Sequence, residues 1–183
     1  LKNLIILRNK KNLGVGGATL RGFKKAINMN FDLVFKIDGD NQHEPSDLKK
    51  FIKFMQKPKV NFCKGTRFKI ETEKKKIPFV RLMGNIVLTY FSKINCRYEN
   101  LTDVVNGFIG IKVSLLRKLN FDKISKDFFF EEDLLFRISL VEKEIYELPI
   151  KTIYFSKSNL NPFKTIMPFM FKHAKNFLIR FKF

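Results

Sequence analysis

Asp38 and Asp40, separated by one glycine, are the residues whose types and spacing best suit chemistry in this sequence. They follow the apolar, β-prone run 33–37, so both carboxylates stand where an expected strand ends. Side chains at positions i and i+2 of an extended chain point to the same face, and the two carboxylates can therefore converge. Such oxygen ligands suit Mg²⁺ or Mn²⁺ holding a diphosphate. The alternative is an acidic turn, because Asp-Gly is common in turns and Pro45 would begin a helix anyway.

The composition indicates one globular domain with an excess of positive charge. Of 183 residues, 45% are hydrophobic and 14% aromatic, which excludes a disordered chain. The formal net charge of +19 favours anionic partners such as nucleotides, phospholipid headgroups or nucleic acid, although biased codon usage can produce part of the excess. Cys63 and Cys96 lie far apart and predict neither a zinc site nor a disulfide framework. A reducing, cytoplasmic setting is the simplest interpretation.

The two ends of the sequence suggest a piece of a longer protein. No apolar run is long enough to cross a bilayer, and no signal peptide opens the chain. The first residue is Leu1, directly before an expected internal strand, and the last is Phe183, inside a helical pattern. We therefore expect a fragment that is truncated at its N-terminal end. Whether it is also truncated at its C-terminal end is left open.

Strands and helices are expected to alternate along the first third of the chain. The expected order is strand, helix, strand, helix and strand, over residues 4–7, 18–29, 33–38, 46–55 and 60–64, with a glycine-containing turn at 12–17. Such alternation predicts right-handed crossovers and a parallel sheet covered on both faces. A ligand crevice is then expected at the carboxyl ends of the strands, where Asp38 and Asp40 fall.

The rest of the chain shows a mixed pattern. Residues 67–78 lack periodicity and predict a mobile loop, for which a solvated surface loop is a better interpretation than an active-site lid. Further elements are expected as helices at 79–91 and 128–141 and strands at 107–112 and 145–150. The tail 161–183 interleaves apolar and basic side chains, which is typical of a helix in a membrane interface. A core-packing helix with a basic outer face fits the tail nearly as well.

Several short motifs follow one another along nearly the whole chain. The first half contains Asn12-x-Gly14-x-Gly16-Gly17-Ala18, Gly22, Ala26, Asp38-Gly39-Asp40-x-Gln42-His43-x-Pro45, Asp47-Leu48 and Gly65-x-Arg67. The second half contains Arg81-x-x-Gly84-Asn85, Thr102-Asp103-x-x-Asn106-Gly107-Phe108, Phe129-Phe130-Glu131-x-Asp133-Leu134-Leu135, Glu147-Leu148-Pro149-Ile150 and Lys157-Ser158. Each motif is weak alone, but their order and spacing resemble the family 2 glycosyltransferases. More narrowly, they resemble the dolichyl-phosphate mannosyltransferase-like branch, which uses polyprenyl-phosphate or other membrane-bound acceptors.

This resemblance implies an α/β fold of the GT-A type, a Rossmann-like, mostly parallel sheet flanked by helices. Residues 1–155 would form a partial GT-A domain, and residues 156–183 a basic amphipathic, membrane-proximal helical tail. The family's first two strand–helix units, with acidic residues that bind the base and ribose, are missing from this chain. The donor site is therefore expected to be incomplete, and a membrane anchor after the tail is a further expectation.

The resemblance also implies a donor site. Transfer of a sugar from a nucleoside diphosphate requires stabilisation of the charge on the leaving diphosphate, which a divalent cation held by carboxylates provides. By resemblance, Asp40 is the main ligand of Mg²⁺ or Mn²⁺, and Asp38 contacts the metal or the ribose. Gln42 is assigned to the donor as well. Gly16 and Gly17 are expected to allow close packing near the nucleotide, and we do not interpret them as a dinucleotide fingerprint.

Candidate residues for the phosphates and the acceptor lie further along the chain. Arg67 and Arg81 are expected to bind anionic oxygens of the donor diphosphate or of a phosphate acceptor, with solvated surface cations as the alternative. Asp103 is either an acceptor-side carboxylate or a loop cap. His43 is expected to support its loop, and His173 to belong to the basic tail.

The catalytic candidates are Asp40, Asp103, Glu131 and Asp133. In the family, an acidic residue near Glu131, Glu132 and Asp133 commonly acts as general base on a hydroxyl acceptor. The helix dipole alone would also favour acidic residues in that first helical turn. A lipid phosphate acceptor is already anionic and needs no strong base, so the motif leaves the acceptor open.

The expected function is metal-dependent transfer of a sugar from a UDP- or GDP-linked donor to a polyprenyl phosphate or another lipid-linked acceptor. It would take place at the cytoplasmic face of a membrane, in cell-envelope glycan synthesis. The altered pattern at residues 154–157 puts the acceptor-side loop in question, and an inactive membrane-associated remnant is one alternative. The other is a basic nucleic-acid-binding module, which the pI of about 10.0 favours and the Asp38 and Asp40 pair opposes.

Overall fold

A computed structural model describes residues 3–153 and 162–182 of the chain. Its centre is a sheet in the spatial order β1-β3-β2-β4. The strands are β1 (Leu33–Lys36), β2 (Phe62–Thr66), β3 (Ile109–Lys112) and β4 (Tyr146–Pro149). The altered pattern at 154–157, the Lys157-Ser158 motif and the expected boundary at residue 155 lie outside the described residues.

The sheet is mixed. Strand β4 is parallel to β2, whereas β3 is antiparallel to both β1 and β2. Strands β1, β2 and β4 therefore run in one direction, as the alternation of strands and helices predicted, and β3 lies between β1 and β2 in the opposite direction. The strand at residues 107–112 was expected, but its direction was not, because hydrophobic periodicity carries no information on strand direction.

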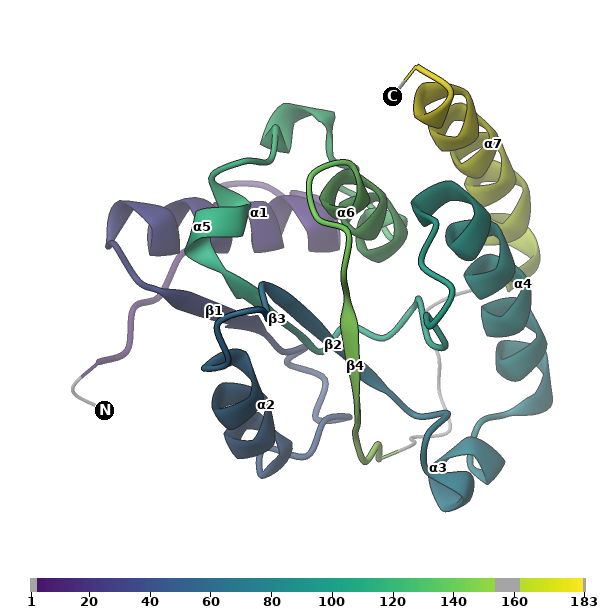
Figure 1. The fold of residues 1–183 in the computed structure, drawn as a ribbon, viewed down its shortest axis with the longest axis horizontal. Coiled ribbons are helices and arrows are strands. Elements are labelled where there is room, and N and C mark those ends of the chain that lie inside the picture. The colour runs from purple at the N-terminus through teal and green to yellow at the C-terminus, as the bar shows by residue number, and fades with distance from the viewer. Residues whose placement is uncertain (1–2, 154–161, 183) are drawn as a thin grey trace.

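Helices cover both faces of this sheet (Figure 1). They are α1 (Gly14–Asn28), α2 (Asp47–Met55), α3 (Glu71–Lys75), α4 (Phe79–Cys96), α5 (Val113–Leu116), α6 (Phe130–Ser139) and α7 (Pro162–Arg180), with a short 3₁₀ turn at Phe121–Lys123. Helices α1, α5 and α6 lie on one face and α2 on the other, while α4 and α7 pack side by side at the end of the molecule beyond β4. This gives a helix–sheet–helix arrangement around a mixed sheet.

Successive side chains along the strands contribute in turn to two hydrophobic cores, one on each face of the sheet. Phe62 and Ile111 join the core under α1 and α6, whereas Cys63 joins the core under α2, together with Phe51 and Met55. Successive residues of a strand point to opposite faces, so an apolar run such as 33–35 supplies both cores.

Residues 4–7 are not a strand, which contradicts the sequence-based expectation. Leu4, Ile5 and Ile6 are exposed, and their backbone pairs with no strand among the described residues. Arg21 of α1 donates to the Arg8 carbonyl at 2.6 Å next to this segment. A β-prone run becomes a strand only when a neighbouring strand supplies the ladder hydrogen bonds, and composition alone does not reveal such a partner.

Helix α1 begins at Gly14, four residues earlier than expected, so the glycines belong to its first turns. Gly14 has a φ of +72°, and its N–H donates to Asn12 Oδ1 at 2.8 Å. A Cβ at Gly14 would stand 2.3 Å from the Lys126 carbonyl oxygen. Glycine is therefore required here both for the left-handed backbone and for the close approach of residue 126.

The segment 67–78 is not simply a mobile loop, because it contains helix α3. The carboxylate of Glu73 on α3 is buried and accepts from the Thr152 N–H at 2.9 Å. This bond attaches α3 to the chain that leaves β4. The expected loop was wrong at residues 71–75, because a one-turn helix is too short to show a periodic pattern.

Helix α7 confirms the expected helical tail and packs against α4. His173 belongs to this helix, as expected, and is buried in the contact with α4. No helix within the described ranges has the length and apolar character needed to cross a membrane.

Candidate active site

The candidate residues gather at one edge of the sheet. Asp38 and Arg67 lie just after the carboxyl ends of β1 and β2. The loop 102–108 leads into the antiparallel β3 at the same edge. Helix α6 begins close by, since its Glu131 contacts the last residue of β1, Lys36. Side chains that are far apart in the sequence therefore meet at the edge where a ligand crevice was expected.

Lys36 connects the first aspartate of the pair with α6. Its Nζ lies 2.7 Å from Asp38 Oδ1 and 2.7 Å from Glu131 Oε1, and its side chain is only 8% exposed. Burial alone would lower the pKa of Lys36, but the two carboxylates outweigh it and raise the pKa. Lys36 is thus a fixed cation. It was not among the predicted site residues, although a lysine in the middle of an apolar run is an available signal.

Asp38 is held in its ionised form. Burial would raise its pKa, but the His43 imidazole and the Lys36 ammonium outweigh burial and lower the pKa to about 2. His43 Nε2 stands 3.8 Å from Asp38 Oδ2, longer than a hydrogen bond, so the 2.7 Å contact with Lys36 is the closer one. A Cβ at Gly107 would lie 2.2 Å from the same Oδ2. Glycine at position 107 leaves the room that the Asp38 carboxylate occupies.

Asp40 lies in a turn and is exposed to solvent. The chain turns at residues 39–40, Asn41 has a φ of 61°, and Asp40 Oδ1 accepts from the Gln42 N–H at 3.1 Å. The extended geometry that would have aligned the carboxylates of Asp38 and Asp40 therefore ends at Asp38, which corrects that expectation. Of the two alternatives, the acidic turn is present, and the metal site stays a prediction.

The carboxylates fit an open divalent cation site better than a closed one. Among residues 3–153 and 162–182, no three or more His, Cys, Asp or Glu side chains form a group that could hold a metal ion alone. Asp38 Oδ1 is occupied by Lys36, whereas Asp40 presents an exposed carboxylate. Mg²⁺ and similar hard cations commonly use one or two carboxylates and take their remaining ligands from substrate phosphates and water. Asp40 can supply such a carboxylate ligand.

Asp103 is the centre of a buried network. Its side chain is 0% exposed and accepts from Arg67 Nε and Nη2 at 2.7 Å each and from Asn85 Nδ2 at 2.7 Å. Burial would raise the pKa of Asp103, but the Arg67 guanidinium outweighs it and keeps the pKa low. The carboxylate links the residue after β2 to the interior of α4, which is the role of a structural anchor.

A row of charged side chains crosses the α6-facing side of the sheet beneath this site. Lys36 and Lys64 both pair with Ile109 of β3, and Lys64 pairs with Glu147 of β4. Lys64 is buried, and its Nζ donates to the Asp103 and Val104 carbonyl oxygens. Lys64 was not among the predicted site residues, although a lysine within an expected strand is a visible signal.

Glu147 completes this row and fixes the loop before β3. Its carboxylate accepts from the Thr102 N–H at 3.0 Å, from the Thr102 hydroxyl at 2.5 Å and from the Asp103 N–H at 3.2 Å. Its motif was noticed in the sequence, but this anchoring role was not.

The three acidic residues of α6 have different surroundings. Glu131 contacts Lys36 at the site. Glu132 is buried, its Oε1 has no hydrogen-bond partner among the described residues, and burial and the charge of Glu131 raise its pKa to about 8. Asp133 accepts from the Ser125 N–H at 2.7 Å and from Asn176 Nδ2 at 3.1 Å. Asp133 therefore connects α7 with α6. Of the three acidic residues, only Glu131 contacts the Lys36–Asp38 pair.

The remaining donor-site candidates take part in packing. Gly17 N–H donates to the Lys126 carbonyl at 3.1 Å, and a Cβ at Gly16 would stand 2.5 Å from the Ser125 carbonyl oxygen. Both glycines thus allow α1 to approach the segment that leads into α6. The Gln42 carbonyl accepts from the Ile153 N–H at 3.0 Å, and this bond ties the Asp40 turn to the chain after β4.

Arg81 stands in the first turns of α4 and is partly exposed. It precedes Asn85 by four residues, so the two share a helix face. Because the Asn85 side chain reaches Asp103, that face borders the site.

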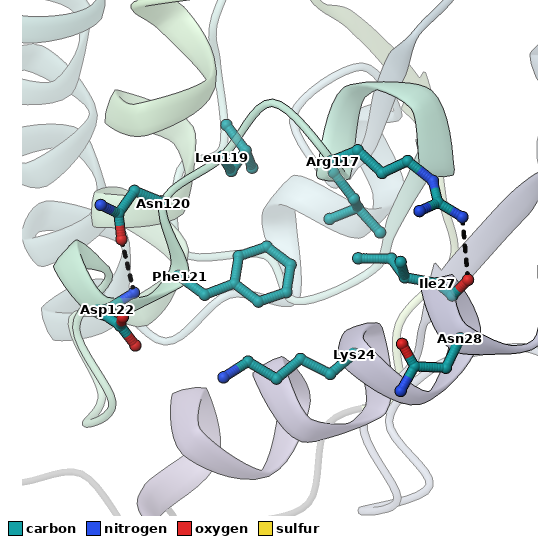
Figure 2. A pocket seen from close by; sticks show the side chains of 9 residues that line it. Lys24, Ile27, Asn28, Arg117, Leu119, Asn120, Phe121 and Asp122 are labelled. Carbon is teal, nitrogen blue, oxygen red and sulfur yellow. Dashed lines mark hydrogen bonds between the residues drawn. The ribbon is translucent and has the colours of Figure 1, made fainter.

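Two pockets lie away from these residues. One, of about 540 Å³, is lined by Lys24, Asn28, Arg117 and Phe121 between α1 and the segment after α5 (Figure 2). The other, of about 690 Å³, is lined by residues such as Asp32 and Lys112. Asp32 precedes β1 and Lys112 ends the antiparallel β3, so the second pocket lies at the opposite edge of the sheet from Asp38. Neither is lined by a predicted site residue.

Comparison with known proteins agrees with this geometry. Residues 1–119 match the family described as Glycosyl transferase family 2. The chain is 31% identical over 151 residues to a UDP-N-acetylglucosamine–dolichyl-phosphate N-acetylglucosaminyltransferase of Methanococcus voltae, covering 82% of this chain and 60% of that protein. It is 27% identical over 146 residues to an undecaprenyl-phosphate mannosyltransferase of Micrococcus luteus, covering 79% of this chain and 59% of that protein.

The fold is also similar to a solved structure. Glucosyl-3-phosphoglycerate synthase from Mycobacterium tuberculosis, in complex with Mn²⁺, uridine diphosphate and phosphoglyceric acid, superimposes with a TM-score of 0.58 at 12% identity. The match covers 96% of this chain and 55% of that one. At this identity the likeness establishes the GT-A fold alone. The chain spans about 60% of the length of the curated relatives that it matches, and it belongs to glycosyl transferase family 2.

Proposed function

We propose that this chain is part of a metal-dependent glycosyltransferase that moves a sugar from a nucleoside-diphosphate donor, UDP- or GDP-linked, to a polyprenyl phosphate. The names of the two curated relatives support this acceptor class. The observation that carries the proposal is the exposed Asp40 carboxylate beside the fixed, ionised Asp38 at the carboxyl end of β1.

Asp40 is proposed as the main ligand of Mg²⁺ or Mn²⁺. Such an ion, when bound, stabilises the charge that develops on the leaving diphosphate. Lys36 neutralises Asp38 from one side, so Asp38 turns only its remaining oxygen to the metal or the ribose. Gln42 continues the Asp40 turn, and its side chain is proposed to contact the donor.

Arg81 is proposed to bind the phosphate of the acceptor. It lies on the α4 face that borders the site, whereas the Arg67 guanidinium already binds Asp103. Arg67 then positions the Asp103 loop and adds positive potential for an anionic ligand. A phosphate oxygen is a nucleophile without a strong base. If the acceptor is a hydroxyl instead, Glu131 is proposed as the general base, because its carboxylate contacts Lys36 of the Lys36–Asp38 pair.

The chain is proposed to work at the cytoplasmic face of a membrane, in cell-envelope glycan synthesis. Polyprenyl phosphates reside in membranes, and the net charge of +19 favours an anionic surface. The proposed division is a partial catalytic domain over residues 1–155 and a basic amphipathic tail over 156–183, of which α7 is the described part.

Calorimetric titration with UDP and with GDP, each with and without Mn²⁺, tests the donor site. We expect Mn²⁺-dependent binding of one nucleotide that Asp40→Asn abolishes. Asp122→Asn, an exposed acid beside the pocket of Figure 2, should leave binding unchanged. Metal-independent binding, or equal loss in both variants, would contradict the assigned site.

Transfer of a labelled sugar to undecaprenyl phosphate or dolichyl phosphate tests the reaction. Donor binding without transfer to either lipid contradicts the acceptor class, and absence of both supports the inactive remnant. Tight, salt-sensitive binding of nucleic acid that needs no metal would favour the other alternative.

A further inference from the structure

Residues 150–153, which follow β4, connect two parts of the candidate site through their backbone, and we call them the bridge segment. On one side, the Ile150 N–H donates to the carbonyl of Thr66, the last residue of β2, at 3.1 Å. The Thr152 N–H donates to Oε2 of Glu73 on α3 at 2.9 Å. This side of the bridge segment is therefore bonded to β2 and to the helix that follows it.

On the other side, the bridge segment is bonded to α2 and to the Asp40 turn. The Lys151 N–H donates to Oδ2 of Asp47, the first residue of α2, at 2.9 Å. The Ile153 N–H donates to the carbonyl of Gln42, at the end of the turn, at 3.0 Å. Figure 1 accordingly shows β4 ending between α2 and α3.

The four N–H groups of the bridge segment are bonded alternately on its two sides, as in an extended chain between two neighbours. The isolated antiparallel pairing of His43 with Thr152 agrees with this strand-like geometry. The bridge segment thus lies between the Asp40 turn and α3 in the manner of a short strand. A shift of α3 would therefore displace the turn, because the same four residues are bonded to both.

Two buried carboxylates hold the bridge segment in the same way. Asp47 and Glu73 are 1% and 4% exposed. Each accepts from a bridge N–H with one oxygen and pairs through the other with a lysine three residues later, Lys50 at 2.6 Å and Lys76 at 2.7 Å. Both lysines are exposed, so these ion pairs contribute little to stability, whereas a buried N–H without an acceptor is costly. The bonds to the bridge segment are therefore the main structural role of the two carboxylates.

The Asp40 turn depends on contacts from outside for its position. Asn41 has a φ of 61°, a left-handed conformation that residues other than glycine adopt less readily. Asp40 is exposed, and its Oδ1 accepts from the Gln42 N–H of the same turn. The bond from the Ile153 N–H to the Gln42 carbonyl attaches this turn to the bridge segment. The place of the Asp40 carboxylate therefore depends on how the bridge segment is held.

We propose that Glu73 is a positioning residue for the cation site. It fixes the bridge segment through Thr152, and the bridge segment fixes the turn that presents Asp40. The inference rests on the proposed function, because it concerns the place where Asp40 is proposed to hold Mg²⁺ or Mn²⁺. Helix α3 ends a few residues before Arg81, the proposed phosphate ligand, so the same contacts connect the acceptor side of the site with the cation side.

Hydrogen exchange without metal or nucleotide tests the bridge. In Glu73→Ala, the amides of residues 39–44 and 151–153 should exchange roughly tenfold faster than in the wild type, because the Thr152 N–H loses its acceptor. Glu73→Gln keeps an oxygen acceptor and should restore most of the protection. The matched control is Glu71→Ala, which removes an exposed acid from the same helix and should exchange like the wild type.

Nucleotide binding measures the effect on the cation site. Glu73→Ala should raise the Mn²⁺ concentration needed for half-maximal binding of UDP or GDP roughly tenfold, whereas Glu73→Gln and Glu71→Ala should stay within about threefold of the wild type. A thermal melt of each variant confirms folding. Ile138→Val, in the core under α6, controls for a general loss of stability. It should lower the melting temperature without raising the Mn²⁺ requirement.

Two outcomes overturn the inference. One is equal exchange of residues 39–44 in Glu73→Ala and Glu71→Ala, whether or not the wild type binds nucleotide. The other is faster exchange in Glu73→Ala with an unchanged Mn²⁺ requirement, since the cation site would then not depend on the bridge segment. A wild-type chain that binds no nucleotide contradicts the proposed function instead. Exchange still decides in that case whether Glu73 holds the turn, because it is measured without nucleotide.

Discussion

Lys36 ends strand β1 with its ammonium 2.7 Å from Oδ1 of Asp38, the first residue of the acidic pair. The same ammonium lies 2.7 Å from Glu131 Oε1. Two carboxylates from distant parts of the chain therefore share one buried cation. Their relative position depends on this lysine, and so does the ionised state of Asp38.

Lys36→Met should destabilise the protein and raise the pKa of Asp38. Without the cation, two partly buried carboxylates remain near each other, and we expect the free energy of unfolding at neutral pH to fall by about 2 kcal/mol. Urea unfolding measures this change, and NMR titration follows the carboxyl of Asp38. Lys49→Met, on the exposed side of α2, should change little. Equal stability of the two variants would contradict a role for Lys36 in holding the pair.

Asp103→Asn should lower the free energy of unfolding by about 3 kcal/mol, because Arg67 then loses its buried ionic partner. Arg67 and Asn85 would also lose the group that joins β2 to α4. Urea unfolding compares this variant with Asp122→Asn, which removes an exposed acid. Full stability with lost transfer activity would instead show that Asp103 acts as a base.

Glu132→Gln should stabilise the protein near neutral pH. The pKa of Glu132 is about 8 in the folded chain against an ordinary 4.5, so folding retains a proton that the unfolded chain releases. Stability therefore falls as pH rises from 4.5 to 8. Gln cannot ionise, so the variant does not lose this stability. From acidic to neutral pH, its free energy of unfolding relative to that of the wild type should rise by about 3 kcal/mol. Urea unfolding across this range measures it, and parallel pH profiles of the two proteins would refute the expectation.

His173 should make the packing of α7 sensitive to acid. Burial lowers the pKa of His173 to about 4 from 6.5, so its contribution to stability is present above pH 6.5 and is lost as pH falls towards 4. His173→Gln keeps an acceptor for Asn95 Nδ2. When the pH falls from neutral to mildly acidic, its free energy of unfolding should decrease by about 2 kcal/mol less than that of the wild type. Hydrogen exchange of α7 amides follows the local effect. Lys175→Gln, an exposed control, should retain the wild-type acid sensitivity.

Local sequence signals determined a large part of the fold. Strand β1 and helix α2 lie where the apolar run 33–37 and the pattern after Pro45 predicted them, because periodicity and helix-start signals act within a few residues. The motif order also predicted the family, which the match over residues 1–119 confirms. The run at 4–7 failed as a strand because strand formation needs a distant partner.

The roles of the individual acids and cations were decided by tertiary structure. Asp103 and Glu132 both stand in acidic motifs that the sequence makes visible, but burial and neighbours make one a bonded anchor and the other a group of raised pKa. Lys36 and Asp38 are two residues apart, yet the other carboxylate that binds Lys36, Glu131, comes from a helix much later in the chain.

The sequence by itself determined that acidic residues follow a strand in a family 2 glycosyltransferase, since residue type and spacing are local properties. Which carboxylate is free for a ligand and which is locked by a cation were decided only by the tertiary structure. The physical reason is that solvation and charge pairing depend on neighbours from distant parts of the chain.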